Sequence, residues 1–170
     1  MGATTPVVDR QEQDIVSTLG TDPQSGSGRI VVGVDGSPSS EEALRWALGQ
    51  ARLTGQPVDA VTSWSIPVTF GEAAGALMGI DWKGEATRTL ESTVAKAVDP
   101  PDADRVSQHA VQGHPAQVLL DAAADAALLV VGSRGRGGFT GMLLGSVSQN
   151  VVARAACPVV VVRAPADSPE

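Results

Sequence analysis

The sequence contains few aromatic, cysteine and lysine residues. Only 3% of the chain is aromatic, and it has no tyrosine. The single cysteine, Cys157, cannot form a disulfide within the chain and leaves no cysteine cluster for a metal. The only lysines are Lys83 and Lys96, and acidic residues outnumber basic ones by 19 to 12. A net charge of −7 argues against a broad surface for nucleic acid or for an anionic membrane.

No apolar stretch is long enough to cross a bilayer, and the first 28 residues lack the basic and apolar regions of a secretory signal. We therefore expect a cytoplasmic protein. Residues 1–28 are polar and irregular and are predicted to form a flexible tail. Residues 29–164 have the length and composition of one α/β domain, and residues 165–170 are predicted to form a second tail.

Five apolar, β-branched segments alternate with helical patterns within this domain. The predicted strands are residues 29–35, 58–64, 105–111, 127–132 and 158–163. The predicted helices begin near Ser39, Asp81, Pro115 and Gly145. Strands that alternate with helices pair in parallel through right-handed crossovers. The pattern therefore predicts an open, mainly parallel α/β sheet with helices on both faces.

Two local signals concern the first helix and the connection after the second strand. Ser39 followed by Glu42 matches a capping box, which predicts a helix start at Ser39. Residues 66–80 contain three glycines without a clean hydrophobic period and are predicted to form a flexible excursion. Trp64, just before that segment, is expected to be a core residue rather than one that stacks on a base.

The strongest functional signal lies in residues 130–152. An apolar run stops at Gly132, and a loop with five glycines leads to Gly145 and Ser146, where a helical pattern begins. Glycines allow positive φ angles, so that successive N–H groups can converge on one point. The start of a helix also favours an anion, and two arginines in the loop add positive charge. This combination predicts a phosphate-binding loop.

The spacing in this loop resembles that of the universal stress protein family. Two residues separate Gly132 from Gly135, and nine residues separate Gly135 from Gly145–Ser146. The loop contains the segments GSRGRGG and LLGSVS, which are typical of that family. The resemblance extends over residues 29–163. It implies a Rossmann-like, adenine nucleotide alpha hydrolase-like fold with five strands in the order 3-2-1-4-5. It also implies ATP as the ligand, with Mg²⁺ as a possible companion.

In that strand order Asp35, at the end of the first strand, faces the glycine loop across one crevice. Asp35 then binds ribose hydroxyls or nucleotide-bound Mg²⁺, or it only caps the turn. Val61 is implied to wall the adenine, and Gly113 lies in a Gly-x-Pro turn where it serves the turn or contacts the ligand. The full nucleotide-binding set implied by the resemblance is Asp35, Val61, Gly113, Gly132, Arg134, Gly135, Gly145, Ser146, Val147 and Ser148.

No catalytic residue is predicted. Gly145–Ser146 lacks the lysine that closes a P-loop, and the sequence has neither a Gly-x-Ser-x-Gly elbow nor a kinase catalytic loop. We therefore expect a stress-response or regulatory domain that holds ATP with little or no turnover, and not an enzyme. Binding of cyclic AMP and slow ATP hydrolysis are the alternatives.

The last predicted strand contains the uninterrupted run Val159–Val162 at a sheet edge. A bare apolar edge favours pairing with another strand, and two antiparallel copies would satisfy both edges around a two-fold axis. A homodimer is therefore predicted, and the resemblance supports this mode. Ala127, Asn150 and the long N-terminal tail depart from the family pattern, but none of them touches the glycine loop.

Overall fold

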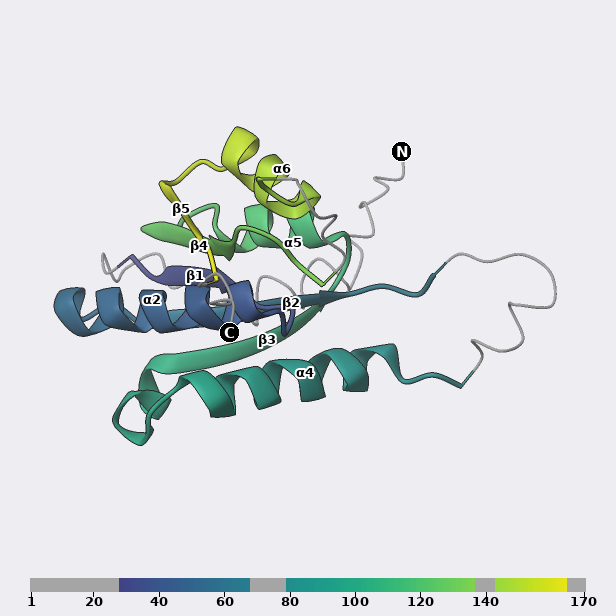
Figure 1. Ribbon diagram of the computed structural model, residues 1–170, viewed down its shortest axis with the longest axis horizontal. Coiled ribbons are helices and arrows are strands. Elements are labelled where there is room, and N and C mark those ends of the chain that lie inside the picture. Colours follow the sequence, from purple (N-terminus) through teal and green to yellow (C-terminus); the bar gives the residue numbers. More distant parts are fainter. Residues whose placement is uncertain (1–27, 68–78, 137–142, 165–170) are drawn as a thin grey trace, which may run out of the picture.

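The computed structural model describes residues 28–67, 79–136 and 143–164, which form a parallel five-stranded sheet between two layers of helices (Figure 1). The strands are β1 (Ile30–Gly33), β2 (Val58–Trp64), β3 (Val106–Gln112), β4 (Leu128–Gly132) and β5 (Val159–Val162). The helices are α2 (Pro38–Thr54), α4 (Trp82–Ala97), α5 (Pro115–Ala122), α6 (Ser146–Arg154) and the 3₁₀ helix η1 (Pro100–Arg105). The strand order β3-β2-β1-β4-β5 confirms the prediction.

Side chains on the two faces of the sheet form two separate hydrophobic cores. On one face, Ile30 and Val32 of β1 pack with α2 and α4. On the other face, Val31 of β1 packs with α5 and α6. Alternate residues of one strand thus supply both cores, as expected for a parallel sheet that is covered on both sides.

The first helix does not begin as the capping box predicted. Its N-cap is Ser37, whose side chain accepts a hydrogen bond from the N–H of Ser40, and Pro38 occupies the first helical position. Glu42 pairs with Arg45 instead of reaching back to the N-cap. The prediction was wrong because Pro38, which tolerates the first helical turn, fits inside the helix and not before it.

The start of α4 agrees with the prediction, but a short helix after it was not predicted. Asp81 is the N-cap of α4 and accepts the N–H of Gly84, as the predicted start near Asp81 implied. The double proline after α4 opens η1, a helix that the sequence patterns did not reveal. Within η1, the buried Asp102 pairs with Arg52 of α2, so a long-range contact stabilises a segment too short for a periodic pattern.

Several predicted features lie outside the described residues. These are the N-terminal tail up to residue 27, most of the 66–80 excursion, loop residues 137–142 and the C-terminal tail from residue 165. Over the ranges that are described, no helix is both long enough and apolar enough to cross a membrane.

Candidate functional site

A large cavity of about 1150 Å³ lies where the strands β1, β2 and β4 end. Because the strands are parallel, their carboxyl ends meet at the same edge of the sheet. The order β3-β2-β1-β4-β5 also reverses its direction of growth at β1, between β1 and β4, and open α/β sheets bind ligands at such a switch point. The walls come from these strand ends, from α4 and from the first turns of α5 and α6.

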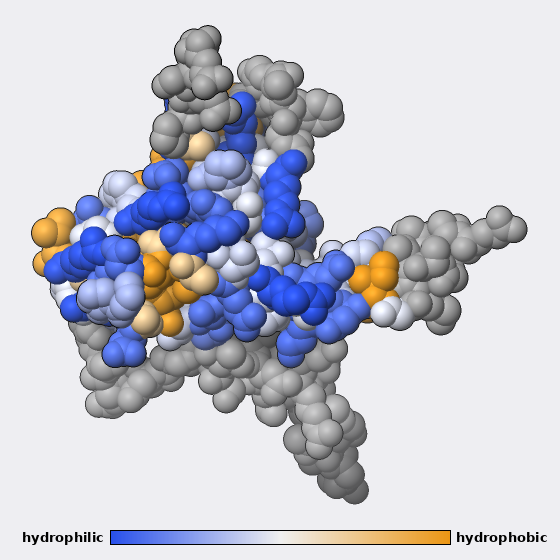
Figure 2. All heavy atoms as spheres, turned by 60° about the horizontal axis from the view of Figure 1, so that its bottom comes forward, coloured by the Kyte–Doolittle hydropathy of each residue, from blue (hydrophilic) through white to orange (hydrophobic). Residues whose placement is uncertain are grey.

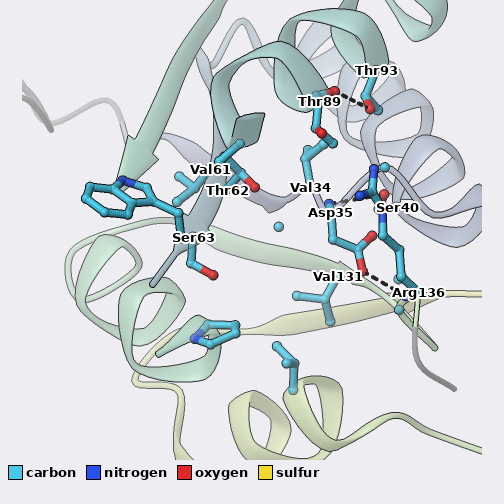
Figure 3. A pocket seen from close by; sticks show the side chains of 18 of the residues that line it. Val34, Asp35, Ser40, Val61, Thr62, Ser63, Thr89, Thr93, Val131 and Arg136 are labelled. Atoms are coloured by element: carbon cyan, nitrogen blue, oxygen red, sulfur yellow. Dashed lines mark hydrogen bonds between the residues drawn. The ribbon is translucent and has the colours of Figure 1, made fainter. Parts of the chain in front are cut away.

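Asp35 stands at the centre of this edge, two residues beyond the end of β1. Its Oδ1 accepts the N–H of Ser37 at 3.0 Å, and its Oδ2 accepts the N–H of Arg136 at 3.3 Å. The carboxylate therefore joins the β1–α2 turn to the glycine loop while it still lines the cavity (Figure 3). The predicted turn-capping role of Asp35 is confirmed, and the predicted contact with ribose or Mg²⁺ stays a prediction.

Hydrogen bonds from the start of α2 fix the first part of the glycine loop. The hydroxyl of Ser39 donates to the carbonyl of Arg134, and the hydroxyl of Ser37 donates to the same oxygen at 3.4 Å. On the other side, the N–H of Gly145 donates to the carbonyl of Ser133 at 2.7 Å. The two ends of the loop are thus held together at the entrance of α6.

Positive φ angles do not explain the loop glycines in the described part. Gly132, Gly135 and Gly145 are absent from the glycines with positive φ, so that part of the prediction was wrong. Close approach explains two of them instead: a Cβ on Gly132 would lie 2.9 Å from the backbone nitrogen of Ser40, and a Cβ on Gly135 would lie 2.5 Å from Oδ2 of Asp35.

The first turn of α6 offers the hydrogen-bond donors for an anion. Gly145 is the N-cap, and among the described residues no side chain caps this helix. The N–H groups of Ser146, Val147 and Ser148 have no carbonyl partner inside the helix, as at every helix start. Ser148 is buried and donates its hydroxyl to the carbonyl of Gly132 at 2.7 Å, which holds the turn against β4. Backbone donors and the helix dipole therefore face the cavity.

Nine of the ten predicted site residues line this one cavity. They are Asp35, Val61, Gly132, Arg134, Gly135, Gly145, Ser146, Val147 and Ser148. Gly113 does not line it: with φ at +148° its N–H donates to the carbonyl of Trp64, and it borders a separate hollow of about 100 Å³. Trp64 lies half-buried on the cavity wall rather than in the core.

The sequence analysis missed the wall formed by α4. This wall contains Trp82, Glu85, Arg88, Thr89, Ser92, Thr93 and Lys96. Arg136 also lines the cavity, although only its charge was noted. The basic and hydroxyl residues of α4 recur at helical spacing, but spacing alone does not tell which side of a helix faces a strand end.

The cavity is basic although the whole chain is acidic. Its lining includes Arg88, Lys96, Arg134 and Arg136 against the carboxylates of Asp35 and Glu85. The chain as a whole has 12 basic and 19 acidic side chains. A concave region with the opposite sign to the rest of the protein concentrates anions, because its walls focus the field.

Two other chemistries find little support in the described ranges. No three His, Cys, Asp or Glu side chains there gather as metal ligands. Burial raises the pKa of the Cys157 thiol, which disfavours the nucleophilic thiolate. Cys157 is therefore a packing residue, which lies against the core on the α5 and α6 side.

Comparison with known proteins identifies the family. The universal stress protein family matches residues 26–163. Universal stress protein Rv2005c of Mycobacterium tuberculosis is 41% identical over 145 residues, which cover 84% of this chain and 47% of that protein. The chain spans about half the length of the curated relatives it matches.

Two solved structures share the fold. A universal stress protein in complex with cAMP is 28% identical, with a TM-score of 0.55, over 83% of this chain and 100% of that one. The universal stress protein from Archaeoglobus fulgidus in complex with dAMP is 25% identical, with a TM-score of 0.53, over 79% of this chain and 97% of that one. From the match over almost the whole described sheet and from its strand order, we conclude that the chain belongs to the universal stress protein family.

Proposed function

We propose that the cavity binds ATP and that the protein acts as a stress-response or regulatory nucleotide-binding domain. One observation carries the proposal: a basic cavity places the glycine loop and the start of α6 opposite Asp35 at the edge of the sheet. Two family members of known structure hold adenine nucleotides, cAMP and dAMP. Their ligands share the base and the phosphate that this cavity suits.

Each part of the cavity suits one part of the nucleotide. Val61, Leu119 and Val131 form an apolar wall on the α5 side, which suits the base. The first N–H groups of α6 and the Arg134 side chain suit the phosphates. Asp35 suits the ribose hydroxyls or a Mg²⁺ ion that arrives with the phosphates, since Mg²⁺ binds through one or two carboxylates plus phosphate oxygens.

Cyclic AMP is the second candidate, because a relative of known structure binds it. It carries one phosphate and no free 3′-hydroxyl. The first N–H groups of α6 and the Arg134 side chain offer several donors to phosphate oxygens, and a ligand with more than one phosphate satisfies them better. We therefore rank ATP above cyclic AMP, and parallel titrations with both ligands distinguish the two.

Turnover of ATP is proposed to be slow or undetectable. Fast phosphoryl transfer needs a positioned base or water-orienting group as well as charge on the γ-phosphate. Both oxygens of Asp35 already accept backbone N–H groups. A steady-state rate of about 1 s⁻¹ or more, as in working kinases, would contradict this part. A cytoplasmic location stays a prediction.

The homodimer through β5 is also a proposal. The four residues Val159–Val162 are half-buried in the single chain, and β5 pairs only with β4 among the described strands. A second copy that pairs with this edge would cover it. Sedimentation of Val161→Lys tests the interface: we expect a monomer, and an unchanged dimer or a monomeric wild type would refute it.

Substitution of Gly135 tests the nucleotide site most simply. Gly135→Val places a side chain against Oδ2 of Asp35 and the cavity, outside both hydrophobic cores. We expect calorimetry to detect no ATP binding, which means a loss of about 100-fold or more, while the circular dichroism spectrum stays unchanged.

Gly49→Ala is the matched glycine control, because nothing lies within 4 Å of an added Cβ there and the position is on α2. It is expected to bind ATP like the wild type. Equal affinity of Gly135→Val and wild type would mean that the loop is an ordinary surface loop.

A further inference from the structure

The nucleotide arrangement proposed above leaves the α4 wall of the cavity without a ligand group. Arg88, Ser92 and Lys96 lie one helical turn apart along α4 and all line the cavity. Figure 2 shows that the face on which α4 lies is mostly hydrophilic, with apolar atoms in small groups. A row of basic and hydroxyl side chains on a cavity wall suits a phosphate group.

Arg136 extends from the glycine loop to the same wall. A Cβ on Gly36 would collide with the guanidinium of Arg136 and would lie 2.8 Å from the methyl group of Thr89. The side chains of Arg136 and Thr89 therefore both lie against the β1–α2 turn at Gly36. Figure 3 shows Arg136 passing Asp35 in the direction of α4. The glycine loop thus adds a third basic group to the wall.

These basic groups have few carboxylate partners in the described part of the chain. Arg88 and Arg136 form no ion pair there, and Lys96 lies 3.9 Å from Oε1 of Glu41. Glu85 is the one acidic residue that α4 contributes to the lining. Like charges that gather without partners repel one another, and an anionic ligand relieves this repulsion.

Asp35 separates the α4 wall from the start of α6. In the sheet, β1 lies between β2, which α4 covers, and β4, which leads into the glycine loop. When a nucleotide has its 5′-phosphates at α6 and one ribose hydroxyl at Asp35, the second of its 2′- and 3′-hydroxyls is free to carry a group toward α4. In dinucleotide-binding folds, an arginine near the ribose accommodates a 2′-phosphate.

We propose that the α4 wall, with Arg88, Lys96 and Arg136, binds a phosphate on the 2′- or 3′-hydroxyl of the ribose. The preferred ligand class is then an adenine nucleotide that carries phosphates on both sides of the ribose. This inference rests on the proposed function, because it takes the adenine nucleotide in the cavity as given.

Isomeric ligands with two phosphates provide the test. ADP, adenosine 2′,5′-bisphosphate and adenosine 3′,5′-bisphosphate differ in where the second phosphate lies. AMP, which has one phosphate, is the reference ligand. We expect one of the two bisphosphates to bind the wild type about tenfold more tightly than AMP, because one added hydrogen bond to a charged group contributes about this gain in affinity. Arg88→Gln and Lys96→Gln are each expected to remove most of that gain and to leave the affinity for ADP within about twofold.

Lys83→Gln is the matched control, because Lys83 lies on the same helix but does not line the cavity. It is expected to bind all three ligands like the wild type. The α4 site would be overturned if Arg88→Gln and Lys83→Gln weakened bisphosphate binding equally, or if Arg88→Gln weakened ADP binding as much as bisphosphate binding. In either case, ADP binding by the wild type would leave the proposed function intact. A wild type that binds none of the nucleotides overturns both.

Discussion

The two ends of the sheet treat charged side chains in opposite ways. At the amino end of the strands, Asp59 of β2 lies between Arg29, whose Nε is 2.9 Å away, and His109, whose Nε2 is 3.6 Å away. Arg29 also pairs with Asp125 at 2.6 Å. At the carboxyl end, Asp35 is held by backbone N–H groups and the nearby arginines face a cavity.

We expect this difference to separate the residues that stabilise the fold from those that bind a ligand within one sheet. Asp59 and Arg29 at the amino end pair with each other and are largely buried, with 10% of the Asp59 side chain and 13% of the Arg29 side chain exposed. The charges at the carboxyl end keep their capacity to interact with a ligand. Changes at the amino end should therefore alter folding, and changes at the carboxyl end should alter binding.

Removal of the central carboxylate at the amino end should have the largest effect. Asp59→Ala leaves the buried Arg29 with only the half-exposed Asp125 as its carboxylate partner in the described part of the chain, and loss of one member of a buried pair costs about 3–5 kcal/mol. Urea unfolding should show this loss, whereas Asp104→Ala, an exposed change on η1, should show almost none. If Asp59→Ala were as stable as the wild type but bound ATP more weakly, it would contradict the proposal that the amino end of the sheet affects folding and not binding.

Two glycines of the loop distinguish packing from ligand contact. Gly132→Ala places a Cβ 2.8 Å from the carbonyl carbon of Ser39 and should cost about 1–3 kcal/mol of stability. Gly145→Ala finds its nearest atom at 3.5 Å and has φ of −75°, so stability should change by no more than about 0.5 kcal/mol. Thermal unfolding of both variants shows which of them is less stable. If Gly132→Ala were more stable than Gly145→Ala, the packing explanation would be contradicted.

Weaker ATP binding by the stable Gly145→Ala protein would indicate that Gly145 contacts the ligand.

The sequence was informative wherever a pattern was local. Alternating strand and helix patterns predicted every strand of the sheet to within a few residues, and nine of the ten site residues that the family resemblance implied line the cavity. The predicted start of α2 was two residues too late because Ser37 and Ser39 both fit an N-cap. Only the position of Pro38 inside the helix decides between them.

The α4 wall could not be predicted in the same way. Arg88 and Lys96 reach the cavity because α4 packs over β2 and β3, and the rotation of a helix on a sheet depends on contacts distant in sequence. The reason why the loop needs glycines could not be predicted either, because it also depends on contacts distant in sequence. Gly135 is required by the carboxylate of Asp35, which lies 100 residues away in the chain.

At the carboxyl end, Asp35→Ala should weaken nucleotide binding by about tenfold, the value of one hydrogen bond to a charged group. Inorganic phosphate, which has no ribose, should bind as it does to the wild type. Calorimetry with ATP and with phosphate checks both expectations. Equal losses for the two ligands would place Asp35 against the phosphates and not against the ribose.

The smallest expected effect is a change in acid stability at the amino end. A hydrogen bond from Arg29 lowers the pKa of Asp125 below its ordinary value of 3.8. Its stabilising contribution is therefore present above pH 3.8 and is lost as the pH falls through the lower folded-state pKa. Since about half of the Asp125 side chain is exposed, Asp125→Asn should cost well under about 1 kcal/mol at neutral pH. Urea unfolding should show this difference vanish at low pH, and a difference that grows on acidification would contradict it.

The melting temperature of the wild-type protein in the presence of ATP tests the central claim most directly. A ligand that binds the folded state alone at 100 times its dissociation constant adds about 2.7 kcal/mol of stability. We predict that the melting temperature rises with ATP concentration and that adenosine, which lacks phosphates, produces a much smaller rise. No rise with ATP up to millimolar concentrations would contradict the account of the carboxyl end of the sheet as a nucleotide site.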